Sequence, residues 1–238
     1  MKILLFSLLA ALFTVAGGGL PLLKKNLGPR GLSLLVAFSA GVLLSAGINH
    51  MIAESYEVIG KWSLLSVSLG FIIVYLLEKG SMIHSCREVG CEVHYIGGFA
   101  LLGIGFHNLL DGIAIAVSME LRFALGAVVV MAVLLHSFPT GISISSIMLA
   151  NGYSLSRSWS ILGLLGGIMV FGTLLGLQIP PHAENLLGMG IGMSAGTFLY
   201  IASADLLPLA HQNNQDYAVP ASFLFGFITI LLTAHLLH

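Results

Sequence analysis

The sequence predicts an all-α integral membrane protein with about eight transmembrane helices in an inverted 3+2+3 repeat arrangement. The chain is 57% hydrophobic and only 8% charged, and its mean hydropathy is +1.01. Water-soluble domains do not have such a composition, so a soluble enzyme is excluded. The net charge of −1 provides no basic surface for nucleic acid. Apolar segments of membrane-spanning length and two internal repeats favour the same fold.

The apolar segments indicate a single transmembrane domain over residues 1–238. A helix that crosses a bilayer needs about 20 mostly apolar residues. Segments of this kind lie at about 3–23, 32–54, 62–78, 96–119, 122–149, 158–178, 186–208 and 218–237. Lys2 gives only a minimal basic region, so we expect the first segment to be a retained helix rather than a cleaved signal peptide.

The distribution of lysine and arginine predicts the orientation of these segments. With the N-terminus outside, the inner side carries Lys24, Lys25, Arg30, Lys79, Arg87 and Arg157, and the outer side carries Lys2, Lys61 and Arg122. Basic residues are enriched in cytoplasmic loops. We therefore expect both termini on the non-cytosolic side, a cytosolic loop at 79–95, and a location in the plasma membrane or an organelle membrane.

A polar hexapeptide, residues 107–112, interrupts the apolar segment 96–119. A carboxylate at mid-bilayer costs roughly 2.5–3.5 kcal/mol on insertion scales, so Asp111 needs a partner. His107 lies four residues earlier and therefore on the same helical face, one turn away. The alternatives are a hydrogen-bonded pair that joins helices and a pair of ligands for a divalent metal.

The hexapeptide returns 29 residues later as residues 136–141. His136 matches His107 in this alignment, and Gly141 matches Gly112. Successive spans run in opposite directions, so the two copies would be related by a two-fold axis in the membrane plane. Both histidines then lie near the midplane, which favours the metal site over the structural pair.

A second repeat relates residues 39–44 to residues 194–199, at an offset of 155. Both begin with Ser-Ala-Gly, and the same offset places His50 opposite Asp205. These segments are five spans apart and have opposite directions, which indicates inverted three-helix units around a central pair. Chance similarity among small residues is the alternative.

Further polar residues could form a pathway for an ion on either side of this site. His50 and Glu54 lie towards the outer end of one predicted helix, and Asp205 and His211 lie at or just beyond the inner end of another. In the loop 79–95, a metal could be held transiently by His84, Cys86, Cys91 and His94. Ordinary solvation is the alternative for all of these residues.

Taken together, the hexapeptide at 107–112, its copy at 136–141, Ala40-Gly41-Val42 with His50, and the string 195–208 resemble the ZIP (Zrt/Irt-like) family of metal transporters. The resemblance covers the whole chain in order. It implies eight helices in a 3+2+3 arrangement and import of a divalent cation towards the cytosol through a site between segments 96–119 and 122–149.

The resemblance also implies a set of metal ligands, namely His107, Asn108, Asp111, His136, Ser137 and Thr140. The last two depart from the family pattern, because many members carry acidic residues there. Neutral hydroxyls are weak ligands, and a second carboxylate that could bridge two ions is missing. We therefore expect a site for one ion.

The sequence thus predicts a transporter without cofactors that moves a divalent metal ion through a lipid bilayer. Histidine and carboxylate ligands favour zinc, and Fe²⁺, Mn²⁺ and Cd²⁺ suit the same ligand types. Two alternatives stand beside it: a membrane metal sensor without flux, and an intramembrane metalloenzyme, for which no His-Glu-x-x-His motif is present. A homodimer is compatible with the sequence.

Overall fold

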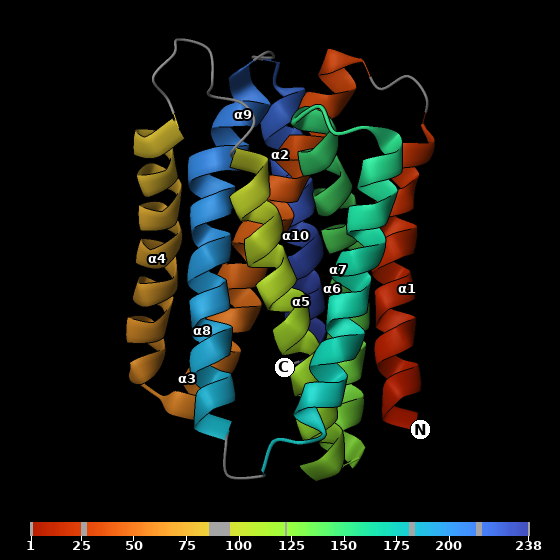
Figure 1. Cartoon of the computed structure of the whole chain (residues 1–238), viewed down its shortest axis with the longest axis vertical. Helices are drawn as coiled ribbons and strands as arrows, with labels where there is room; N and C mark the ends of the chain where they lie inside the picture. The colour runs from red at the N-terminus through yellow and green to blue at the C-terminus, as the bar shows by residue number, and fades with distance from the viewer. Residues whose placement is uncertain are drawn as a thin grey trace.

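The computed structural model describes residues 2–24, 28–85, 96–121, 123–180, 184–212 and 216–237, and within these ranges the regular structure is entirely helical (Figure 1). The elements are α1 (Lys2–Leu23), α2 (Pro29–Ser45), the π-helical segment η1 (Ala46–Met51), α3 (Ile52–Ile59), α4 (Trp62–Ser85), α5 (Ile96–Leu121), α6 (Phe123–Ala150), α7 (Leu155–Gly176), α8 (Glu184–Tyr200), the π-helical segment η2 (Ile201–Leu206), α9 (Leu207–Gln212) and α10 (Ala218–Leu237). The predicted all-α fold class is confirmed.

The helices run side by side along the long axis of the molecule, and both chain ends lie towards the same end of the bundle (Figure 1). Among the described residues, 7 helices are long and apolar enough to cross a membrane, and α10 adds a shorter apolar stretch at Ala218–Thr233. Two of the long helices are composite, because α2, η1 and α3 are continuous, as are α8, η2 and α9. The protein is therefore a multi-pass membrane protein.

Several predicted boundaries are corrected by the structure. The helix expected at 32–54 extends over 29–59, and the helix expected at 186–208 extends over 184–212, because a π-helical turn continues each one. The helix expected at 158–178 lies at 155–176, where the Ser154 side chain caps its first turn. The predicted loop 79–95 begins later, because α4 continues to Ser85 beyond the buried Glu78.

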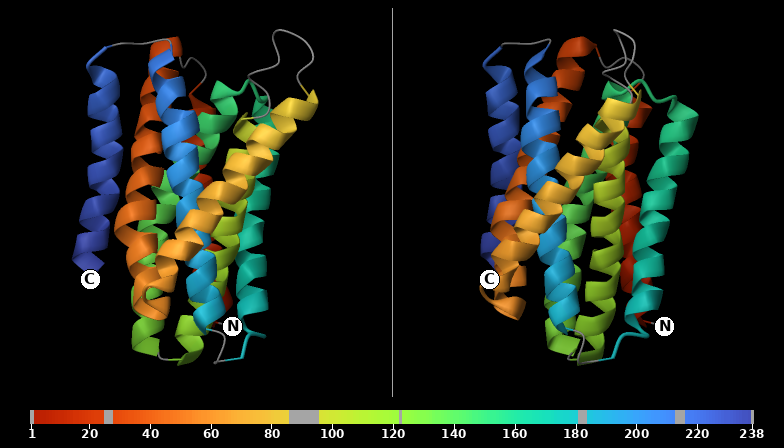
Figure 2. Two further views of the ribbon diagram at one scale, coloured as in Figure 1. Left: turned by 90° about the vertical axis from the view of Figure 1, so that its left-hand side faces the viewer. Right: turned by 60° about the vertical axis from the view of Figure 1, so that its left-hand side comes forward.

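The helices form two groups, each held together by extensive internal packing. In the first group, α1 packs on α6 and α7, and α5 packs on α7 and α6. In the second group, α2 packs on α10, α4 packs on α8, and α3 packs on α8. Figure 2 shows α10 at one flank beside α2, and α4 inclined across α8. The groups meet mainly where α2 lies against α6 and α5 lies against α8.

Pairs of glycines mark the closest helix crossings inside each group. At each of them a Cβ atom would lie 1.9–2.2 Å from a backbone oxygen of the opposite helix, so no larger residue fits without moving the helices apart. The pairs are Gly17 with Gly141 (α1 and α6), Gly112 with Gly172 (α5 and α7), Gly41 with Gly226 (α2 and α10), and Gly70 with Gly196 (α4 and α8). Backbone contact thus fixes the depth of each helix against its neighbour.

These crossings follow the two repeats seen in the sequence. Gly17 and Gly172 differ by 155 residues, as do Gly41 and Gly196, and the same offset carries η1 onto η2. Gly112 and Gly141 differ by 29, as do the two histidines of the hexapeptides. The α1–α6 crossing is therefore equivalent to the α7–α5 crossing, in agreement with the inverted 3+2+3 arrangement.

The crossing of α5 and α7 provides a test of this packing. A Cβ atom at Gly172 would lie 2.1 Å from the backbone oxygen of Leu109, whereas nothing lies within 4 Å of a Cβ atom at Gly167 on the same helix. Overpacking typically costs about 1–3 kcal/mol, so Gly172→Ala should lower the unfolding temperature in detergent, measured by tryptophan fluorescence. Gly167→Ala is the matched control and should unfold at or above the temperature of the unmodified protein, since alanine favours a helix. Equal unfolding temperatures for the two variants would contradict the account.

Candidate metal site

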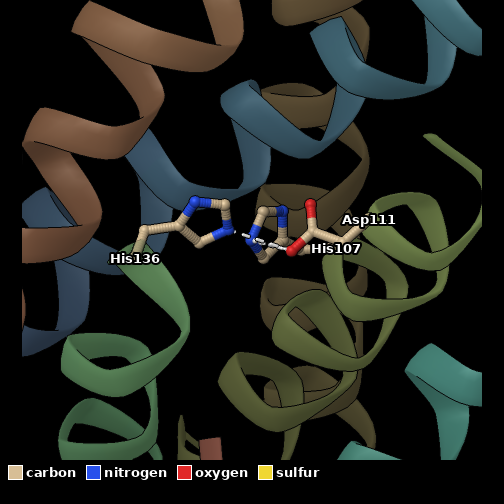
Figure 3. Close-up of side chains that lie close together, drawn as sticks. All are labelled: His107, Asp111 and His136. Atoms are coloured by element: carbon tan, nitrogen blue, oxygen red, sulfur yellow. Dashed lines mark hydrogen bonds and ion pairs between the residues drawn. The ribbon is translucent and has the colours of Figure 1, made fainter. Parts of the chain in front are cut away.

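Three side chains of the types that bind metals meet where α5 and α6 of the first helix group face the second group. His107 and Asp111 lie one turn apart on α5, and His136 projects towards them from α6 (Figure 3). One ligand atom from each residue lies within 4.8 Å of the others. The imidazole residues are almost fully enclosed, with exposed fractions of 3% for His107 and 5% for His136. The structure therefore brings together the two histidines that the repeat of the hexapeptide had matched and Asp111, which the spacing had placed one turn from His107.

The Asp111 carboxylate is the centre of this cluster. Its Oδ2 atom lies 3.0 Å from Nε2 of His136, which is a hydrogen-bonding distance and geometry. The same oxygen lies 3.2 Å from Nε2 of His107, but the angles of that contact are not those of a hydrogen bond. The buried Nε2 of His107 therefore has no hydrogen-bond partner. A buried nitrogen left in this state, facing a carboxylate and a second imidazole, is suited to bind a cation.

The other three predicted ligands are engaged elsewhere in the same region. The amide of Asn108 donates to the Leu165 carbonyl of α7 at 3.1 Å. The hydroxyl of Ser137 donates to the Val133 carbonyl at 2.6 Å, and that of Thr140 donates to the His136 carbonyl at 2.8 Å. All three side chains are buried, and their hydrogen bonds satisfy polar groups next to the cluster without joining it. Their role as ligands stays a prediction.

His50 and Glu54 lie beside the cluster, on the second helix group. His50 belongs to η1, and its ring centroid is 5.5 Å from that of His136. Its Nε2 atom is 3.7 Å from Oε2 of Glu54, one turn later on α3. Both line a cavity of about 360 Å³ whose wall also includes His107 and Asp111. The sequence had placed the two residues towards a helix end, and the structure places them in contact with the central region.

The cavity extends from the cluster towards one end of the bundle. Its wall includes residues of α3, the last turn of α5 and the first turns of α6 and α8, among them Val58, Leu121, Val128 and Leu187. Figure 1 shows α3 and the start of α8 at the end where the N-terminus lies. His107 and Asp111, which line the cavity, are thus reached from that end of the molecule.

Asp205 occupies a different position from the predicted one. It lies inside η2 rather than at the end of its helix, and its exposed fraction is 6%, because η2 continues into α9. Glu78 of α4 lies near enough to interact electrostatically with Asp205 and with Tyr200. Oε2 of Glu78 and Oδ2 of Asp205 are buried without a hydrogen-bond partner. His211 is exposed, and its ring donates to the Leu207 carbonyl at 2.9 Å.

The sequence did not identify Glu78 as a site residue. It precedes Lys79 and Gly80, so the polar run looked like the start of a loop. One feature of the sequence could have identified it. A helix that starts at Trp62 and is long enough to cross a membrane includes Glu78, so this carboxylate lies within the span. In the predicted loop, the backbone of His84 lies in α4, and Cys86, Cys91 and His94 lie outside the described residues.

Comparison with known proteins identifies the family. The sequence model described as "ZIP Zinc transporter" matches residues 82–234. The chain belongs to the ZIP zinc transporter family. It is 27% identical over 235 residues to zinc transporter ZIP13 of Pongo abelii, covering 85% of this chain and 69% of ZIP13. It is 24% identical to zinc transporter ZupT of Chlorobium chlorochromatii, covering 95% and 94% of the two chains.

Other relatives are longer than this chain. The match to zinc transporter YKE4 of Saccharomyces cerevisiae is 24% identical and covers 98% of this chain and 79% of YKE4. The match to zinc transporter ZIP10 of Homo sapiens covers 62% of this chain but only 19% of ZIP10. Membership in the ZIP family confirms the prediction of a metal transporter that is not an enzyme and uses no cofactor, with the metal ion as substrate.

Asp111 allows a direct test of the cluster. Replacement by asparagine removes the one carboxylate among the three clustered residues, and Zn²⁺ binding by the purified protein should weaken more than about 100-fold, since supporting residues alone contribute 10–100-fold. Competition with a zinc-sensitive dye measures this change. Ser118→Ala is the control on the same helix, because the Ser118 hydroxyl lines the cavity but donates to the Ala114 carbonyl. Equal affinities for the two variants would exclude Asp111 as a ligand.

Proposed function

We propose that this ZIP family member carries Zn²⁺ across the membrane towards the cytosol, one ion at a time, through the site formed by His107, Asp111 and His136. The observation that carries the proposal is the unpartnered Nε2 of His107, buried beside a carboxylate oxygen that also contacts His136. A permanent structural pair would satisfy that nitrogen. A site that binds and releases a cation leaves it available.

The ligand chemistry supports zinc as the substrate. Two imidazole nitrogens and one carboxylate oxygen form a common ligand set for Zn²⁺ when a fourth position is open. Among the described residues the cluster has no thiolate, which would favour Cu(I). Fe²⁺, Mn²⁺ and Cd²⁺ accept the same ligands, and the zinc transporters among the relatives favour zinc over these ions.

The proposed direction rests on the distribution of charge and on the cavity. Lys24, Arg30, Lys79 and Arg157 lie at the end of the bundle away from the N-terminus, which the positive-inside rule assigns to the cytosol. The cavity reaches the cluster from the opposite end, where the N-terminus lies. An ion would thus enter from the non-cytosolic side, and Asp205 with the neighbouring Glu78 would receive it on the cytosolic side.

The remaining predicted residues have supporting roles in this proposal. Asn108, Ser137 and Thr140 would hold the backbone next to the cluster through their hydrogen bonds to main-chain carbonyls. His211 lies in the last turn of α9, beyond Asp205. The loop histidines and cysteines would collect or release the ion in polar surroundings and tune the flux without being required for it.

Transport by the purified protein tests the proposal. In liposomes loaded with a zinc-sensitive dye, the unmodified protein should produce an inward Zn²⁺ signal, and His107→Ala and His136→Ala should each reduce the initial rate at least about tenfold, because each removes a ligand. Comparable amounts of inserted protein must be verified for each sample. Saturable binding without flux in the unmodified protein would instead identify a sensor.

The number of ions at the site is a separate prediction. Only one carboxylate belongs to the His107–Asp111–His136 cluster, and two dications about 4 Å apart repel strongly at low dielectric. Anomalous diffraction at the zinc edge from crystals grown with Zn²⁺ should therefore show one ion between α5 and α6. Two well-occupied peaks there would overturn the single-ion site.

A further inference from the structure

The charge of the central cluster does not balance a divalent ion. Asp111 supplies one negative charge, and both imidazoles must be neutral to act as ligands. A Zn²⁺ ion held by these three residues alone would leave one net positive charge in the interior of a membrane protein. Such a charge is costly unless it is paired or reaches water. The surroundings of the cluster should therefore contain a second carboxylate.

Glu54 is the carboxylate in the right place. Its side chain faces the same cavity as His107 and Asp111, and it interacts electrostatically with both Asp111 and His136. Its exposed side-chain fraction is 29%, so it borders the open space of the cavity rather than the packed core. With Glu54 and Asp111 both ionised, one Zn²⁺ would be electrically neutralised.

His50 has the spacing of a further imidazole ligand. Two imidazoles on one tetrahedral zinc, with Zn–N distances of about 2.0–2.1 Å, place their ring centroids roughly 5 Å apart. His107 and His136, which belong to the cluster, are separated by 5.4 Å. His50 and His136 are separated by 5.5 Å. His50 also lines the same cavity wall as His107 and Asp111.

We propose that His50 and Glu54 bind the transported ion together with His107, Asp111 and His136, so that the site is completed across the boundary between the two helix groups. This inference rests on the proposed function and adds to it. His107, Asp111 and His136 come from the first group, while His50 and Glu54 come from η1 and α3 of the second. An ion held by both sets joins the two groups, and its release requires the two sets of ligands to separate.

Zinc affinity of purified full-length variants tests the proposal. His50→Ala and Glu54→Gln should each weaken Zn²⁺ binding at least about tenfold, because each removes a ligand. Glu57→Gln is the matched control. Glu57 lies three residues after Glu54 on α3 and lines the same cavity, but its side chain is exposed. Removing its charge should change the affinity by no more than about twofold, because water and salt screen an exposed charge.

His136→Ala, measured in parallel, separates the two proposals. Loss of binding in His136→Ala together with unchanged affinity in His50→Ala and Glu54→Gln would overturn this inference and leave the central site standing. Unchanged affinity in His136→Ala would reject the central site itself. Tenfold losses in all three variants, with Glu57→Gln unchanged, would support the five-residue site.

X-ray absorption at the zinc edge gives a result that does not depend on any variant folding. Scattering from imidazole rings counts the histidines on the bound ion in the unmodified protein loaded with one equivalent of Zn²⁺. Three imidazoles would support His50 as a ligand. Two imidazoles would overturn it.

Discussion

The structure depends on the need to compensate the Asp111 carboxylate, which lies in the middle of a membrane-spanning helix. An isolated carboxylate at mid-bilayer costs roughly 2.5–3.5 kcal/mol on insertion scales, and Asp111 lies deep within α5. Two imidazoles approach the same oxygen of this side chain, at 3.2 Å and 3.0 Å. They come from different helices, so compensation requires α5 and α6 to be fixed in depth and rotation relative to one another. The packing of the first helix group serves this requirement, since both helices are held by glycine crossings to α7 and α1.

The two helix groups combine rigid interiors with a polar boundary. Inside each group, glycines bring backbones into direct contact at Gly17, Gly112, Gly41 and Gly70 and at their partners, and such crossings cannot slide without a clash. At the boundary, α2 faces α6 and α5 faces α8, and the cavity with its histidines and carboxylates opens between them. The histidines and carboxylates of the proposed site thus lie away from the glycine crossings, where the binding and release of an ion would leave the packing inside each group unchanged.

The sequence predicted the central residues because their spacing is local. His107 and Asp111 share a helical face by their four-residue separation, and the 29-residue repeat identifies His136 as the counterpart of His107. It could not predict which neighbouring helix each remaining polar side chain meets. Periodicity orients a residue on its own helix only, whereas the contact of His50 with His136 and the electrostatic interaction of Glu78 with Asp205 depend on how distant helices cross. Helix ends were misplaced where a polar residue such as Glu78 is buried by a neighbour that the sequence does not reveal.

The two π-helical segments relate the 155-residue repeat to the proposed pathway of the ion. η1 and η2 differ by 155 residues, and each replaces a regular turn in the middle of a long helix. Single π-helical turns are rare in proteins, and those that occur are often found at functional sites. Here each of them contains one polar residue of the proposed pathway, His50 in η1 and Asp205 in η2. The backbone irregularity is therefore shared by both halves, while the side chains differ. An inverted repeat with identical residues would present the same ligand on both sides of the central site. Imidazole at one position and carboxylate at the other make the two sides chemically distinct within one symmetric framework.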